Sequence, residues 1–363
     1  MRIVELRLRF FRLPLLGELA WGRASRLEAL EHALIEVRLD GGAVGRGEVA
    51  IRPTIYGETP ESVEGALRYL APGLRGRSIE DVEGLRSVLD RLPGNLTARG
   101  GLDLALWAAR AAARGVLLRE LLPPERDRVE VAYILGLGEL EAVLEDAAFA
   151  YDRGVRVFKV KVGRDLAADT RRLEALRLRF PDADLYADAN ETLGPEEAPR
   201  YLAAWRELGL RYVEEPLPIE RVRERAALRA RRLLPIVADD SAFTPRDLRR
   251  ELALDTFDVL NVKPARSGFT GSLAMLALAR HADKRVMVGS QAFSSFGAYH
   301  ALLVAFRSEV TEPSELAFHL KAEGAFFPFP PIRGGWVHLG DLPEEDFDEG
   351  VFAAYETRSI RIL

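Results

Sequence analysis

Lysine is rare in this chain, and the positions where it remains are candidates for proton chemistry. The sequence has 51 Lys+Arg residues, and only five of them are lysine, namely Lys159, Lys161, Lys263, Lys284 and Lys321. A GC-rich genome or adaptation to heat would account for the general preference for arginine. Arginine replaces lysine well as a solvated cation, but it keeps its proton at working pH, whereas an amine can release one. We therefore single out Lys159, Lys161 and Lys263, and we expect Lys284 and Lys321 at the surface.

Acidic residues end three successive β-rich runs. The runs close with Asp188 and Asn190, with Glu214 and Glu215, and with Asp239 and Asp240. One acidic residue in such a place usually caps the next helix or pairs at the surface. Three carboxylates on adjacent strands would repel one another unless a cation compensated them. Because the available ligands are oxygens, we predict one Mg²⁺ or Mn²⁺ per chain.

The elements that must position these side chains form a barrel. Eight short β-rich runs recur at nearly even intervals, beginning near Glu130, Val157, Asp184, Tyr212, Pro235, Val259, Arg285 and Glu309. Helical stretches fill most of the gaps, which predicts a closed parallel barrel with its chemistry at the C-terminal strand ends. An open, doubly wound sheet is the alternative. It would need a glycine-rich phosphate loop, and residues 135–139 supply only a bare Gly-x-Gly.

The N-terminal part follows a different pattern. Val4, Leu6, Leu8 and Phe10 alternate with charged residues, and a second alternation over 33–39 leads through a glycine-containing turn into 43–50. Helical patterns cover about 59–72, 79–91 and 99–114. The proline pair at 123–124 predicts a boundary. We expect an α+β capping domain over 1–125, a catalytic barrel over 126–322, and a tail over 323–363 that returns to the cap.

Composition excludes several classes of protein. The formal net charge of −5 does not suit a nucleic-acid partner, and the absence of cysteine excludes disulfides and thiolate chemistry. No apolar run is long enough to span a bilayer, and the first ten residues alternate charge with bulk, unlike a secretory signal. These features predict a cytoplasmic enzyme with no nucleic-acid or membrane partner.

Five short motifs, in order and one per strand, resemble the enolase superfamily in its muconate-lactonizing, muconate cycloisomerase-like subgroup. They are Lys159-Val160-Lys161, Asp188-Ala189-Asn190, Val213-Glu214-Glu215-Pro216, Ala238-Asp239 and Asn261-Val262-Lys263. The resemblance implies an α/β fold, a (β/α)7β TIM-like barrel under an α+β cap. It implies Asp188, Glu214 and Asp239 as metal ligands, and Lys161 and Lys263 as acid/base lysines with Lys159 beside them. It also implies a homo-oligomer.

The same resemblance implies a reaction on a small carboxylate substrate through an enediolate. Ser314-Glu315-Leu316 is similar to the ending of muconate cycloisomerases, whereas dipeptide epimerases carry an Asp-x-Asp there. Segments 52–59, which contains Tyr56, and 267–272 are also similar to muconate cycloisomerases. Conversion of muconate to muconolactone is the favoured activity. The alternatives are an N-acylamino acid racemase or dipeptide epimerase, an o-succinylbenzoate synthase and, remotely, a non-catalytic barrel.

The remaining site residues have supporting roles in this interpretation. Asn190, Asp240, Glu315 and Tyr56 are expected beside the metal or the substrate. Loops near 16–26 and 51–57 are expected to carry specificity. Their arginines, Arg23 and Arg52, are candidates for holding a second carboxylate of the substrate.

Overall fold

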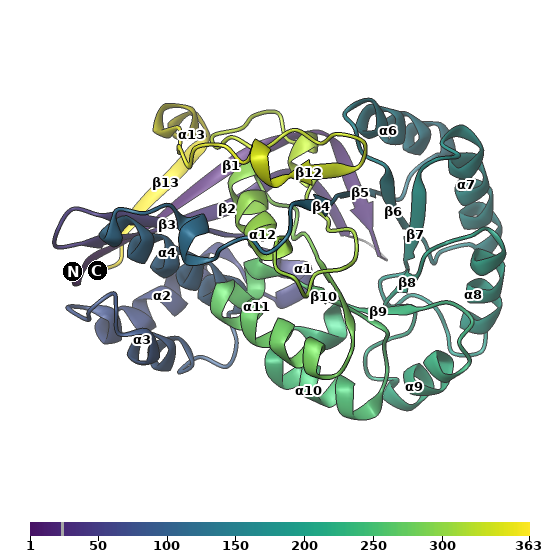
Figure 1. The fold of residues 1–363 in the computed structure, drawn as a ribbon, viewed down its shortest axis with the longest axis horizontal. Helices are drawn as coiled ribbons and strands as arrows, with labels where there is room; N and C mark the ends of the chain where they lie inside the picture. Colours follow the sequence, from purple (N-terminus) through teal and green to yellow (C-terminus); the bar gives the residue numbers. More distant parts are fainter. Residues whose placement is uncertain (23–24) are drawn as a thin grey trace.

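The computed structural model describes residues 1–22 and 25–363 and shows a helix-covered parallel sheet beside a smaller antiparallel sheet (Figure 1). The parallel sheet has the order β11-β10-β9-β8-β7-β6-β5. Its strands are β5 (Ala132–Leu135), β6 (Val157–Lys161), β7 (Asp184–Asp188), β8 (Val213–Glu214), β9 (Ile236–Ala238), β10 (Val259–Val262) and β11 (Arg285–Val288). The helices that follow them in turn are α6 (Leu140–Asp152), α7 (Leu166–Arg179), α8 (Ala198–Glu207), α9 (Val222–Ala230), α10 (Pro245–Leu254), α11 (Pro264–His281) and α12 (Ser295–Ala305).

Residues 311–315 close the sheet into a barrel, although they do not form a regular strand. The amides of Thr311 and Glu315 donate to the carbonyls of Val286 and Val288 on β11. On the other side, Ser314 exchanges backbone hydrogen bonds with Glu130 and Ala132. The eighth strand expected near Glu309 is therefore an irregular segment. Pro313 interrupts it because proline has no N–H to donate to a ladder.

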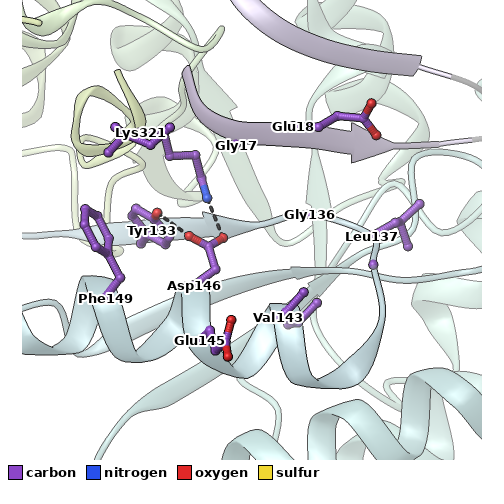
Figure 2. Close-up of a pocket in the computed structure, with 13 residues that line it drawn as sticks. Gly17, Glu18, Tyr133, Gly136, Leu137, Val143, Glu145, Asp146, Phe149 and Lys321 are labelled. Atoms are coloured by element: carbon purple, nitrogen blue, oxygen red, sulfur yellow. Dashed lines mark hydrogen bonds and ion pairs between the residues drawn. The ribbon is translucent and has the colours of Figure 1, made fainter. Parts of the chain in front are cut away.

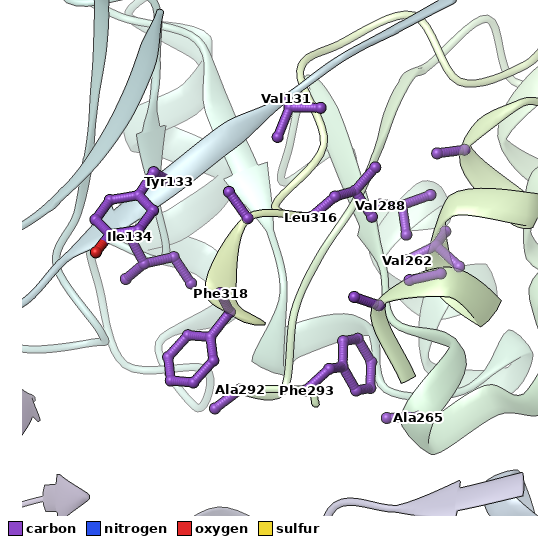
Figure 3. Packing of buried hydrophobic residues seen from close by; sticks show 14 of the residues in the cluster. Val131, Tyr133, Ile134, Val262, Ala265, Val288, Ala292, Phe293, Leu316 and Phe318 are labelled. Atoms are coloured by element: carbon purple, nitrogen blue, oxygen red, sulfur yellow. The ribbon is translucent and has the colours of Figure 1, made fainter. Parts of the chain in front are cut away.

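One layer of apolar side chains fills the inside of the barrel. It takes one residue from each strand, all at most 1% exposed: Ala132, Val157, Tyr186, Tyr212, Val237, Val259 and Met287. Side chains two positions further along a strand point to the same face. The next layer toward the C-terminal ends therefore receives Lys159, Asp188, Glu214, Asp239 and Asn261. Outside the sheet, residues such as Val262, Val288 and Phe293 pack in the larger hydrophobic core (Figure 3).

The antiparallel sheet combines the two ends of the chain in the order β13-β1-β2-β3. The strands are β1 (Ile3–Trp21), β2 (Ser25–Leu39), β3 (Val44–Val49) and β13 (Glu356–Arg361). The N-terminal part also contains α1 (Pro53–Tyr56), α2 (Pro60–Leu74), α3 (Val82–Leu89), α4 (Leu96–Arg114) and α5 (Leu118–Leu121). Strand β4 (Arg128–Glu130) pairs with β12 (Trp336–His338), and helix α13 (Glu349–Tyr355) precedes β13. No helix in the described ranges combines the length and hydropathy that crossing a membrane requires.

Two close contacts, one from β3 and one from α4, fix the N-terminal part on the barrel. Glu48 of β3 is buried and accepts hydrogen bonds from the amides of Ser294 and Gly297, so it caps α12. Helix α4 packs against α11 at Gly100, where an added Cβ would overlap the carbonyl of Ala265. The backbone of α11 cannot yield as a side-chain tip can, so this position accepts only glycine without a shift.

We predict that Gly100→Ala lowers the free energy of unfolding by about 1–3 kcal/mol through this overlap. Gly65→Ala is the matched control, because Gly65 also lies inside a helix but an added Cβ would meet nothing within 4 Å. That change should raise the free energy of unfolding by about 0.5–1 kcal/mol through helix propensity. Urea unfolding of both variants measures the contrast. Equal effects would show that α4 and α11 are not in close contact.

Candidate active site

Lys159 lies at the centre of a buried polar cluster in the barrel mouth. Its ammonium donates to Glu214 at 2.7 Å and to Glu315 at 2.6 Å, and it lies 3.0 Å from Asp188. Burial opposes the charge on Lys159, but these carboxylates outweigh it and raise its pKa well above the ordinary value. Burial and the neighbouring acids Asp188 and Glu315 raise the pKa of Glu214, although Lys159 opposes this. The cluster is therefore one buried ammonium group, that of Lys159, surrounded by three carboxylates.

Lys161 shares its carboxylate partner with Lys159. The two lysines extend from the same face of β6, and Lys161 donates to Asp188 at 2.5 Å and to Asn190 at 2.8 Å. Lys161 is the register partner of Asp188, and Asp188 is that of Glu214, so the three residues lie side by side on adjacent strands. Burial favours the neutral acid, but the two ammonium groups lower the pKa of Asp188 to about 2.

Asp239 lies on the other side of the cluster and is held by two cations. It forms ion pairs with Lys263 and with Arg266, the latter at 2.9 Å. These cations outweigh burial and lower the pKa of Asp239, while Asp239 in turn raises that of Lys263 against burial. The adjacent Asp240 lies 3.8 Å from Arg266, and burial beside Asp239 raises its pKa to about 7.

Asp188, Glu214 and Asp239 offer the ligands of a hard divalent cation, but their side chains are turned toward the lysines. In the described ranges, no group of three or more His, Cys, Asp or Glu side chains has the arrangement of a metal site. Two observations nevertheless fit a further cation. Asp239 Oδ1 is buried and accepts no hydrogen bond from the described residues, although Arg266 lies near it. Crowding by acids also raises the pKa of Glu214.

A cavity beside the lysines is lined from both parts of the molecule. Leu19, Trp21, Arg52 and Ile55 come from the N-terminal part, and Lys159, Lys161, Asn190, Asp239, Asp240, Lys263 and Glu315 come from the barrel. Arg52 is 4% exposed, and among the described residues its guanidinium donates to three backbone carbonyls, those of Ile51, Gln291 and Ala292. Arg23 lies outside the described residues.

Tyr56, expected beside the metal or the substrate, is not among the residues that line this cavity. Its hydroxyl accepts a hydrogen bond from Gln291 at 2.5 Å and a longer one from Arg266 at 3.4 Å. Burial raises the pKa of Tyr56 to about 12. Tyr56 therefore connects the segment after β11 with the arginine that holds Asp239.

The sequence analysis missed Arg266 and misplaced Lys321. Arg266 gave no signal because arginine is the common cation of this chain. Lys321, expected at the surface, is 8% exposed and donates to Asp146, which also accepts from the Tyr133 hydroxyl at 2.6 Å (Figure 2). Tyr133 and Ile134 are neighbours on β5 that point to opposite faces, so Lys321 lines a different cavity from the one above. Lys284 is half-buried and bonded to Asp255.

A barrel whose mouth carries buried lysines and carboxylates under an α+β cap matches known families. Residues 142–343 match the model described as "Enolase C-terminal domain-like", and residues 23–123 match "Mandelate racemase / muconate lactonizing enzyme, N-terminal domain". The chain belongs to the enolase superfamily, in its muconate lactonizing enzyme-like subgroup, and is an isomerase-type enzyme. Members of this superfamily use a divalent metal, usually Mg²⁺.

Its relatives act on different substrates. N-succinylamino acid racemase of Thermus thermophilus is 32% identical over 93% of this chain and 95% of its own length. L-Ala-D/L-Glu epimerase of Bacillus subtilis is 30% identical over 74% of this chain and 75% of its own. A structure of muconate lactonizing enzyme from Mucobacterium Smegmatis, complexed with muconolactone, has a TM-score of 0.92, with 29% identity over 99% and 100% of the two chains. These relatives share small carboxylate substrates.

We predict that Lys159→Met destabilises the fold by about 3–5 kcal/mol, because it leaves buried carboxylates without their common cation. Urea unfolding in the presence of a chelator measures this loss. Lys284→Met is the control: its carboxylate partner Asp255 is largely exposed, so its loss should stay below about 1 kcal/mol. A similar small loss for both variants would contradict the central role of Lys159.

Proposed function

We propose that this chain converts a carboxylate substrate through an enediolate, with Asp188, Glu214 and Asp239 holding a divalent cation. The all-oxygen donor set, its position on three adjacent strands and the raised pKa of Glu214 support Mg²⁺. A bound cation would supply Lewis-acid stabilisation of the substrate carboxylate and of the charge that develops on it. The homo-oligomeric state and the cytoplasmic location stay predictions of the sequence.

We propose Lys161 and Lys263 as the groups that move a proton at the α-carbon. They reach the cavity from strands on opposite sides, and each is bonded to a carboxylate, Asp188 or Asp239. In the structure, Asp239 raises the pKa of Lys263, whereas proton transfer near neutral pH favours a lower value. A cation that competes for the oxygens of Asp239 would weaken this pairing and lower the pKa of Lys263.

Muconate cycloisomerisation is the activity that we favour: Arg52 supports a dianionic substrate, and the muconate cycloisomerase-like Ser314-Glu315-Leu316 ending favours muconate among the dianions. The guanidinium lies in the cavity wall, and its described hydrogen bonds end on neutral carbonyls. It can therefore accept a second carboxylate of a dianionic substrate. Glu315, in contrast, already accepts hydrogen bonds from Lys159, Asn261, Tyr186 and the amide of Ser290, which leaves it less capacity to bind a substrate ammonium. This argues against a dipeptide with a free amine.

Racemisation of an N-succinylamino acid is the second candidate. Such a substrate also carries two carboxylates, and the Thermus thermophilus relative matches almost the whole chain. A racemase needs a proton-transfer group on each face of the α-carbon, and Lys161 and Lys263 meet that need. o-Succinylbenzoate synthesis, represented by a relative with 26% identity, would use the same groups.

We predict that Lys161→Arg and Lys263→Arg both keep the fold and the affinity for Mg²⁺, since each keeps its positive charge. At least one should lose about 10²-fold or more in turnover, because a guanidinium does not exchange a proton at working pH. In a racemase both lysines are essential, whereas in a cycloisomerase one variant keeps partial activity. Turnover and solvent exchange of the α-proton distinguish these cases. Near-normal rates in both variants would make the lysines structural cations.

We predict that a panel of cis,cis-muconate, N-succinylamino acids, dipeptides and an o-succinylbenzoate precursor identifies a dianion as the best substrate. Arg52→Gln should raise KM for that dianion about tenfold or more, since a charged hydrogen bond is lost. N-acetylamino acids, which lack the second carboxylate, are the control and should not respond. Rapid epimerisation of dipeptides without any action on muconate would refute the favoured activity.

A further inference from the structure

A third cavity lies between the N-terminal part and the barrel, and Arg266 is among its lining residues. Its volume is about 300 Å³, within the range of small-molecule sites. Helices α3 and α4 contribute one wall, and the segments that begin α10 and α11 contribute the other. Four of the lining side chains are arginines, Arg86, Arg99, Arg246 and Arg266.

The acids in this cavity do not balance its arginines. The lining acids are Asp90 and Asp103. Asp103 is half-buried and accepts hydrogen bonds from both the amide and the hydroxyl of Thr270, at 2.9 and 2.7 Å. Asp90 is shared by two arginines, at 2.9 Å from Arg99 and 3.6 Å from Arg86. Arg266 is already paired with Asp239 and Asp240, so the other three arginines exceed the two lining acids by one positive charge.

Several guanidinium donors on this wall have no acceptor. Arg246 is exposed and makes no hydrogen bond or ion pair with any described residue. The Nε groups of Arg99 and Arg266 are buried and have no partner in the described ranges. The side chain of Arg266 is fully buried, so its donor cannot turn to bulk water.

We propose that this cavity binds a small oxyanion, either phosphate or a carboxylate, and that the bound anion acts on the active site through Arg266. Guanidinium groups form paired, charge-assisted hydrogen bonds with both kinds of anion. Arg266 is the connection because it also donates to the backbone carbonyl of Asp239 at 2.9 Å and forms an ion pair with its carboxylate. The side chain of Arg266 has no exposed surface, so an anion in the cavity acts on it by Coulomb attraction without contact, and this attraction weakens the hold of Arg266 on Asp239.

Calorimetric titration with inorganic phosphate, and separately with succinate, tests the binding in chelator-treated protein. One saturable site per chain is expected for at least one of the two anions. The anion that binds shows whether the site takes phosphate or a carboxylate. The double variant Arg86→Gln/Arg246→Gln should weaken that site at least tenfold. Arg249→Gln is the matched control on α10, because Arg249 is exposed, does not line the cavity and contacts only the carbonyl of Pro245. The Arg249→Gln variant should bind the anion with an affinity within twofold of that of the unsubstituted protein.

Absence of saturable binding, or equal affinity in the three proteins, would overturn the proposed site. The link to the active site rests on the proposed metal role of Asp239, whereas the anion titration does not. With the anion present, Mg²⁺ should bind several-fold more tightly to the original chain and unchanged to the double variant. Anion binding without any change in Mg²⁺ affinity would overturn the link through Arg266 and leave the proposed reaction untouched.

Discussion

The whole site depends on burying ionised side chains on top of an apolar layer. Four carboxylates, Asp188, Glu214, Asp239 and Glu315, lie in direct ion pairs with four cations, Lys159, Lys161, Lys263 and Arg266. Removing charges from water costs several kcal/mol per ion, so each must find its partner at short range. The barrel achieves this because its parallel strands bring their C-terminal ends together. The hydrogen-bond register between neighbouring strands then fixes which side chains lie side by side.

Two-residue periodicity explains how much of this arrangement the sequence could predict. Val157 and Lys159, Tyr186 and Asp188, and Tyr212 and Glu214 each repeat the same step from the apolar layer to the polar layer. The motifs therefore sufficed to predict the barrel, which the structure and the family comparisons confirm. They also predicted which end of the barrel carries the lysines and acids. Which acid each lysine contacts was not predictable, because it depends on distances across the barrel rather than along a strand.

Other features left no mark that sequence reasoning could recognise. Arg266 is one arginine among many, and only the fold reveals that it holds Asp239. Lys321 is one of the five lysines, but it lies outside the predicted strands, so it was expected at the surface. Its packing against Tyr133 and Asp146 buries it, and this long-range contact is visible only in the fold. The closing segment around Pro313 had the spacing of a strand, but its proline prevents a continuous ladder. In each case a long-range contact decides the outcome.

Charge balance also limits what the site can bind. With Asp240 and Arg52 included, five acids and five cations lie in or beside the cavity and their formal charges cancel, so a divalent cation would add an excess of two positive charges to the site. A substrate with two carboxylates restores neutrality, whereas a zwitterionic dipeptide brings no net charge and leaves the excess uncompensated. The electrostatics of the buried layer thus favour a dianion independently of any single contact to the substrate.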